Sequence, residues 1–160
     1  MPDDDGIRWP REFAEAPVHV SNEMVMNVPC ANVWAWLVRA DLWPDWYPNS
    51  ANVKFDGGSG PDLQAGTKFW WKTFSASIVS TVREFIPGER ISWDGNGLGV
   101  RAYHAWLIQE EKGGCRVLTE ERQHGFLCRL NSLVFPNRMH KGHQLWLERL
   151  QEKARGGPPA

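Results

Sequence analysis

The side chains with the clearest capacity for chemistry are a carboxylate and a histidine on two predicted strands. Glu121 shares one strand face with Thr119, and His104 shares a face of the preceding strand with Trp106. A carboxyl group in an apolar pocket has a raised pKa, which suits a general acid or base, and a neighbouring histidine could exchange protons with it. Glu121 and His104 become candidate catalytic residues where these strand faces line a pocket, a direction that the family resemblance given below implies. A one-residue error in strand phase would instead turn Glu121 toward solvent.

Two further histidines raise the alternative of a metal site. His140 and His143 are three residues apart in a predicted helix, so both could face the same side. Zinc sites need three or four ligands, and no third ligand with convincing spacing accompanies this pair. We therefore expect no metal and no cofactor, and we treat both histidines as ligand-facing side chains.

The positions of the cysteines indicate whether they are paired. Cys30, Cys115 and Cys128 are scattered, and no CxxC spacing occurs. The pattern predicts three reduced, mostly buried thiols in a cytoplasmic protein.

Composition excludes several classes of protein. The 160 residues predict one domain, and 18 basic against 19 acidic side chains give a formal net charge of −1. A near-neutral balance argues against a general nucleic-acid binder. No apolar stretch approaches 18 residues, so no membrane span is expected. The acidic start MPDDD is unlike a signal peptide, which favours a cytoplasmic location.

Hydrophobic periodicity predicts the elements that must position these side chains. Residues 1–17 read as a loose lead-in segment, 18–155 as a single domain, and 156–160 as a flexible tail. The first strand should bend near residues 21–22, and the last helix should start or bend at Pro136. The predicted strands are 18–28, 52–56, 67–74, 77–86, 90–94, 100–109 and 115–123, and the predicted helices are 30–40, a single turn within 41–48, and 126–154.

This order of elements indicates an α+β fold. Short Gly or Pro turns between the strands imply antiparallel neighbours. A long C-terminal helix laid across a curved sheet leaves a space that is open at one end, so a ligand pocket is the default hypothesis. The glycine-rich loops 57–61 and 95–99 are predicted to open at its mouth.

Four motifs resemble the START-like helix-grip superfamily, also called SRPBCC or polyketide cyclase/dehydrase-like. They are MNVPCANVWAWL at 26–37, DLWPDWYP at 41–48, VREFIPGERISW at 82–93 and GGCRVLTEE at 113–121. The last resembles the family's GGT-R-V hairpin with cysteine in place of threonine. The resemblance covers roughly residues 18–154. It implies a curved antiparallel sheet of about seven strands around a long C-terminal helix, with two short helices after the first strand.

The resemblance implies fold more specifically than activity, because the superfamily includes lipid and hormone binders, aromatic cyclases, dehydratases and substrate domains of ring hydroxylases. Our first hypothesis is that the cavity binds a hydrophobic, aromatic or lipid-like small molecule. The alternative is a polyketide cyclase- or dehydratase-like enzyme that uses Glu121 and His104 as proton carriers. A second alternative is a protein-interaction module. A monomer or homodimer is compatible with each.

The family's inward strand positions indicate which side chains line the cavity. Three of the ten tryptophans fall at such positions, although a single tryptophan is more often part of the core. The expected ligand-binding residues are Phe69, Trp71, Thr73, Ser80, Trp93, Trp106, Thr119, His140 and His143.

Overall fold

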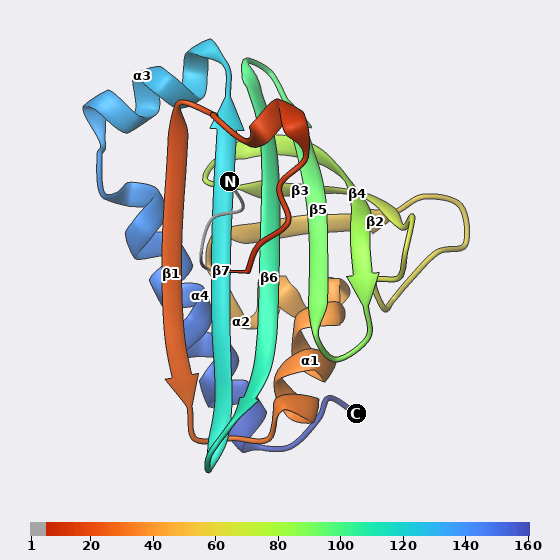
Figure 1. The fold of residues 1–160 in the computed structure, drawn as a ribbon. Helices are drawn as coiled ribbons and strands as arrows, with labels where there is room; N and C mark the ends of the chain where they lie inside the picture. Colours follow the sequence, from red (N-terminus) through yellow and green to blue (C-terminus); the bar gives the residue numbers. More distant parts are fainter. Residues whose placement is uncertain (1–5) are drawn as a thin grey trace.

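A single curved sheet organises the chain (Figure 1). The structure is a computed structural model, which describes residues 6–160. All neighbouring strands pair antiparallel, in the order β1-β7-β6-β5-β4-β3-β2. The strands are β1 (Val18–Met26), β2 (Ser50–Phe55), β3 (Lys68–Thr73), β4 (Ala76–Ile86), β5 (Arg90–Gly97), β6 (Val100–Glu111) and β7 (Gly114–His124).

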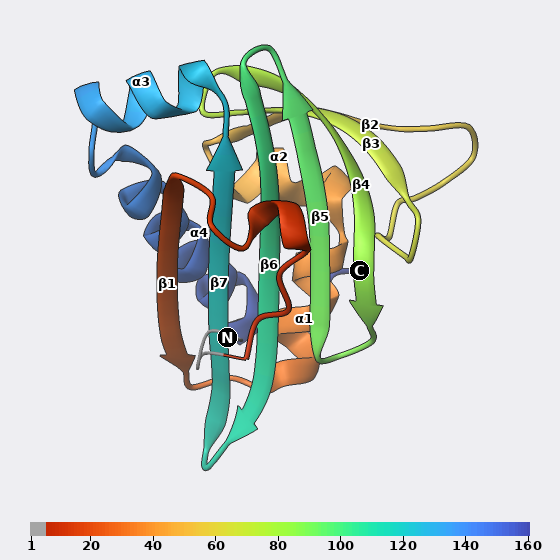
Figure 2. The same cartoon turned by 45° about the horizontal axis from the view of Figure 1, so that its top comes forward.

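The α-helices cover one face of this sheet. Figures 1 and 2 show α4 and α1 behind the strands, with α3 at one end of the sheet. The helices are η1 (Arg11–Phe13), α1 (Cys30–Val38), η2 (Ala40–Leu42), α2 (Trp43–Trp46), α3 (Phe126–Val134) and α4 (Arg138–Arg155). The arrangement confirms the predicted helix-grip fold, including the short helices after the first strand.

Strand alternation divides the buried side chains into two cores. On β6, His104 and Trp106 point toward α4, and Trp106 joins the large core between sheet and helices. Tyr103 and Leu107 point to the opposite face and join a smaller core. The phases predicted for this strand are therefore confirmed.

The smaller core corrects the prediction of a loose lead-in. Ile7 and Phe13 are buried against the outer face of β6 and β7. Arg122 on β7 donates hydrogen bonds to the carbonyls of Phe13 and Ala14, and its guanidinium lies over the Trp9 ring. Figure 2 shows the segment crossing the strands. Residues 6–17 are mostly neither helix nor strand, so their few apolar residues show no periodicity that could have predicted this packing.

The expected bend in the first strand is also wrong. β1 pairs with β7 in unbroken register from Val18 to Met26. The polar residue that suggested a break, Asn22, is buried at an inward position and donates to the His140 carbonyl and the Gln144 side chain on α4, at 3.1 Å each. A hydrogen-bonded polar side chain can therefore occupy a core position.

The C-terminal helical segment breaks at Pro136, as expected, and the break changes which side chains face the sheet. α4 buries His143, Leu147, Leu150 and Ala154, together with Trp146. Leu133 and His140, which the single-helix prediction placed on the same stripe, are exposed. Leu133 lies on α3, so it does not share the register of α4.

Two smaller predictions also fail. Gly95-Asn96-Gly97 is part of strand β5 instead of a turn, and the chain reverses at Leu98 and Gly99. The predicted flexible tail is held in part, because the Trp36 indole donates to the Gly157 carbonyl at 2.7 Å.

The thiol prediction is wrong for two of the three cysteines. Cys30 at the start of α1 and Cys115 at the start of β7 form a disulfide across 85 residues of sequence, and Cys128 is free and buried. Scattered positions concealed the pair because β7 comes next to α1 only once the strands between them have paired. In residues 6–160, no helix is both long and apolar enough to cross a membrane.

The disulfide predicts a measurable loss of stability. Replacing both Cys30 and Cys115 by serine should lower the free energy of unfolding by about 4 kcal/mol, because an 85-residue loop is no longer closed in the unfolded chain. Urea unfolding followed by tryptophan fluorescence measures the change, and Cys128→Ser is the matched control. Unfolded, unreduced protein should expose one titratable thiol, and finding three would contradict the pairing.

Candidate functional site

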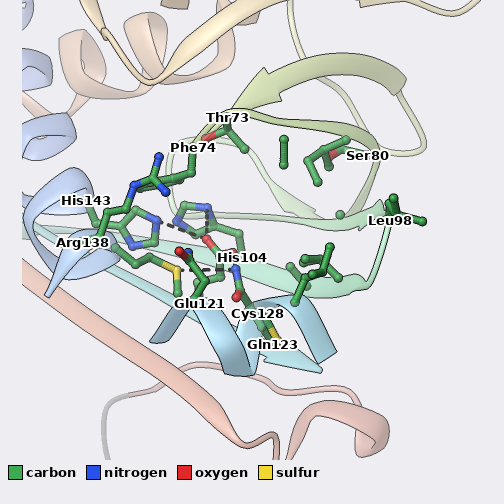
Figure 3. A pocket seen from close by; sticks show the side chains of 18 of the residues that line it. Thr73, Phe74, Ser80, Leu98, His104, Glu121, Gln123, Cys128, Arg138 and His143 are labelled. Carbon is green, nitrogen blue, oxygen red and sulfur yellow. Dashed lines mark hydrogen bonds and ion pairs between the residues drawn. The ribbon is translucent and has the colours of Figure 1, made fainter. Parts of the chain in front are cut away.

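A cavity of about 400 Å³ lies between the concave face of the sheet and the helices α3 and α4. Its wall is mostly apolar and is built by β3, β4, β5, β6 and β7 on one side (Figure 3). The aromatic and aliphatic lining residues are Trp71, Phe74, Ala76, Ile78, Trp93, Leu98, Val100, Ala102, Leu127, Leu130, Val134, Phe135, Met139 and Trp146.

Three titratable side chains from three elements meet in this cavity. His104 lies on β6, Glu121 lies directly opposite on β7, and His143 reaches them from α4. The Glu121 Oε2 atom is 3.3 Å from His104 Nδ1 and 3.1 Å from His143 Nε2 (Figure 3). We call these three side chains the His–Glu–His cluster.

Hydrogen bonds behind the cluster fix its orientation. The Thr119 hydroxyl lies 2.7 Å from His104 Nε2, and the Gln123 amide donates to Glu121 Oε1 at 2.6 Å. An ionised Glu121 accepts a hydrogen bond from a proton-bearing Nδ1 of His104, and His104 Nε2 faces the Thr119 hydroxyl, which also reaches the Ala105 carbonyl at 3.3 Å. Both ring nitrogens of His104 are then occupied, whereas His143 Nδ1 is buried without a hydrogen-bond partner among the described residues.

Electrostatics in the cluster differ from the sequence expectation. Burial by itself raises the pKa of Glu121, but hydrogen bonds from His143 and Gln123 and the nearby His104 outweigh it and hold that pKa well below its usual range. Burial is also the main cause that lowers the pKa of His104, to about 3. The predicted raised pKa for Glu121 is therefore wrong: near neutral pH the cluster holds an ionised carboxylate beside the neutral imidazole of His104.

Aromatic packing restricts the side-chain rotations in the cluster. The rings of His104 and His143 stack at 4.7 Å between centroids, and His104 also stacks on Trp106 at 5.3 Å. Trp146 packs edge-on against His104 at 5.5 Å. A site held in this way is ordered before any ligand arrives.

The structure brings most of the predicted residues to the cavity. Trp71, Thr73, Ser80, Trp93, His104, Glu121 and His143 line it. Ser80 also accepts a hydrogen bond from the Trp71 indole at 3.0 Å.

Four predicted ligand-binding residues lie outside the lining. Phe69 and Trp106 are buried in the core, and Thr119 lies behind His104. His140 is exposed on α4, where the break at Pro136 places it. The predicted loop 57–61 does not contribute to the lining, whereas Gly95 of β5 and Leu98 of the β5–β6 turn do.

At the mouth of the cavity the sequence predicted the loop that carries Leu98 but not the helix α3. Leu98 at the tip of the β5–β6 hairpin is 90% exposed, and α3 exposes Phe126, Leu133 and Val134. The backbones of the hairpin and of the segment before α3 approach closely at Gly99 and Gly125. A Cβ on Gly125 would lie 2.2 Å from the Gly99 carbonyl oxygen, so this contact requires a glycine. Frequent apolar residues between positions 126 and 135 were the available signal, but their spacing predicted one amphipathic helix continuous with α4.

Comparison with known proteins identifies the class. Residues 17–155 match the family described as polyketide cyclase/dehydrase and lipid transport, so the chain belongs to this family. The match confirms the predicted superfamily and is compatible with ligand binding in the cavity. No match to this chain is found among curated proteins.

Solved structures support the same fold. The hypothetical protein jhp0584 from Helicobacter pylori is 30% identical with a TM-score of 0.87, over 96% of this chain and 99% of that one. TTHA0849 from Thermus thermophilus is 14% identical with a TM-score of 0.73, over 89% and 100%. The di-domain aromatase/cyclase StfQ from the steffimycin biosynthetic pathway is 13% identical with a TM-score of 0.73, over 91% of this chain and 53% of that one.

The buried pairing predicts a stability effect at Glu121. Glu121→Ala should lower the free energy of unfolding by about 2–4 kcal/mol, because both imidazoles lose the acceptor they face while buried. Urea unfolding measures the change, and His140→Ala on the exposed side of α4 should stay within about 0.5 kcal/mol. A Glu121→Ala protein as stable as the wild type would show that the carboxylate is not needed to satisfy the two histidines.

Proposed function

We propose that the protein binds a hydrophobic small molecule, aromatic or lipid-like, in the cavity between the sheet and α4. The observation that carries this proposal is a cavity of about 400 Å³ with a mostly apolar wall and one buried polar cluster. Ligand pockets of this size class combine apolar walls with a few polar groups that orient the ligand. Membership of a family described by cyclase, dehydrase and lipid-transport activities supports it.

The wall favours a flat or greasy ligand over a polar one. Trp71 and Trp93 present ring surface from two strands, and Phe74 and Phe135 also line the cavity. Arg138 lies near both phenylalanine rings, at 5.8 Å and 6.0 Å from their centroids. Aromatic rings gain area burial and offset stacking, and a guanidinium in the lining can meet a polar end of the ligand.

Ligand binding is testable by filling the cavity. Ala102→Leu should weaken binding by about tenfold or more, because the added atoms project into the cavity from β6. Intrinsic tryptophan fluorescence, titrated with aromatic polyketides, fatty acids and sterols, measures the affinity. Ala65→Leu, on an exposed loop, is the matched control. A flat response of the wild type across the panel would contradict binding and favour the protein-interaction module.

The second candidate function is acid–base catalysis of a cyclisation or dehydration, as in cyclase- or dehydratase-like enzymes. The His–Glu–His cluster at the cavity favours it, because such reactions take a proton from carbon and give one to oxygen. Both ring nitrogens of His104 already face a partner, Glu121 and Thr119, so His104 is a poor candidate for the proton carrier that the sequence predicted. His143 Nδ1 makes no hydrogen bond within the described residues, so we propose His143 as the base, Glu121 as the carboxylate that orients it, and His104 as the residue that positions Glu121.

Turnover would separate these roles. With a substrate that the fluorescence panel identifies, His143→Asn and Glu121→Gln should each lower kcat by about 100-fold or more, since one removes the base and the other its orienting charge. Steady-state kinetics measure the loss. His140→Asn should leave kcat unchanged. Turnover that survives both substitutions would remove the acid–base mechanism while leaving ligand binding intact.

Location and assembly stay predictions. The cytoplasmic location expected from the sequence competes with the Cys30–Cys115 disulfide, because structural disulfides persist mainly in oxidising compartments. A monomer or homodimer without nucleic-acid partners remains our expectation, the latter from the near-neutral charge.

A further inference from the structure

The His–Glu–His cluster has the composition of a metal site. Two imidazole nitrogens and one carboxylate oxygen from three separate elements lie within 4.8 Å of one another. The sequence raised only the pair His140 and His143, for which no third ligand was found, because His104 and Glu121 lie on strands that precede the helix by many residues. In the fold, His104 and Glu121 take the place of His140.

Two of the three distances in the cluster match the edges of a coordination polyhedron, and the two imidazole nitrogens lie within 4.8 Å of each other. Two ligand atoms bonded to Zn²⁺ at about 2.0–2.1 Å with a tetrahedral angle are about 3.3 Å apart. Glu121 Oε2 is 3.3 Å from His104 Nδ1 and 3.1 Å from His143 Nε2. The contacts of Glu121 with each histidine are therefore already at the spacing of two ligands on one ion.

The charge balance also favours a cation. Glu121 is buried in an apolar cavity, and its ion pairs within residues 6–160 are those with the two histidines. A divalent ion would compensate the buried carboxylate, whose isolated burial is costly.

His104 and Glu121 each make a second hydrogen bond, on the side away from the centre of the cluster. Metal ligands in proteins are commonly oriented by hydrogen bonds of this kind. The Thr119 hydroxyl faces His104 Nε2 at 2.7 Å, which leaves Nδ1 directed at the centre of the cluster. The Gln123 amide holds the second Glu121 oxygen at 2.6 Å, so Oε2 stays directed inward. Such partners orient the ligands and tune their basicity.

We propose that His104 Nδ1, Glu121 Oε2 and His143 Nε2 bind one divalent transition-metal ion of the Zn²⁺ class. Three protein ligands leave an open position, and all three side chains line the cavity, so that position faces the bound molecule. Two imidazoles favour Zn²⁺, Fe²⁺ or Co²⁺ over Mg²⁺ and Ca²⁺. An ion there would polarise an oxygen of the hydrophobic ligand and anchor it. This last role rests on the proposed function, whereas metal binding itself does not.

Cobalt provides a direct probe. Chelator-treated wild-type protein, titrated with Co²⁺, should form a one-to-one complex with the intense visible absorption of low-coordinate cobalt. Zn²⁺ should displace it, and a large excess of Mg²⁺ should not. Calorimetry with Zn²⁺ should give the same stoichiometry. A wild-type protein without a one-to-one Co²⁺ or Zn²⁺ complex would overturn the proposal without any variant.

Variants assign the ion to the cluster. Glu121→Gln and His143→Asn should each weaken Zn²⁺ binding by more than about 100-fold, beyond the effect typical of outer-shell changes, and Thr119→Val should weaken it by about tenfold. His140→Asn, on the same helix and exposed, is the matched control and should bind as the wild type. Circular dichroism and tryptophan emission check the fold of each variant. Equal loss in His140→Asn, or none in the cluster variants, would place the ion elsewhere and overturn the assignment.

The two proposals fail separately. Fluorescence titration of the hydrophobic panel, with metal-free and Zn²⁺-loaded protein, reports on the cavity independently of cobalt absorption. Ligand binding without metal binding overturns the metal site alone, and metal binding with a flat fluorescence response overturns the proposed ligand alone.

Discussion

The buried carboxylate of Glu121 is the constraint on which the site depends. An ionised group without water needs donors or a cation on every accessible side. The sheet supplies His104 from the facing position of β6 and Gln123 from the same strand, and α4 supplies His143. The register of β6 on β7 and the docking of α4 are therefore coupled at one atom, Glu121 Oε2.

Aromatic packing next to the cluster supports the same coupling. Tryptophans 43, 71, 93 and 146 pack against one another at one end of the cavity, with Trp43 as their common neighbour. This end is a solid core. The opposite end is bounded by α3 and the β5–β6 hairpin, whose apolar side chains are partly exposed. The protein thus keeps rigid packing beside the polar cluster and an apolar opening beyond it.

Sequence patterns predicted the elements better than their contacts. Alternation along β6 separated His104 from Tyr103 on opposite faces, and the family motifs indicated both the helix-grip fold and the inward direction of His104, because both depend on local order. The predictions that failed depended on long-range contacts. The Cys30–Cys115 pair joins residues 85 apart, and the pKa of Glu121 depends on donors from another strand and a helix. His143 as partner of Glu121 required the break at Pro136 to be placed in three dimensions.

The short segment before β1 has a consequence for where the domain begins. The family match starts at residue 17, yet Ile7 and Phe13 cover the outer face of the strands that carry His104 and Glu121. The strand pair at the centre of the site is thus the middle layer of three, with the cavity on one side and this segment on the other. A boundary drawn from the family pattern would leave Tyr103 and Leu107 as a new apolar surface directly behind the cluster.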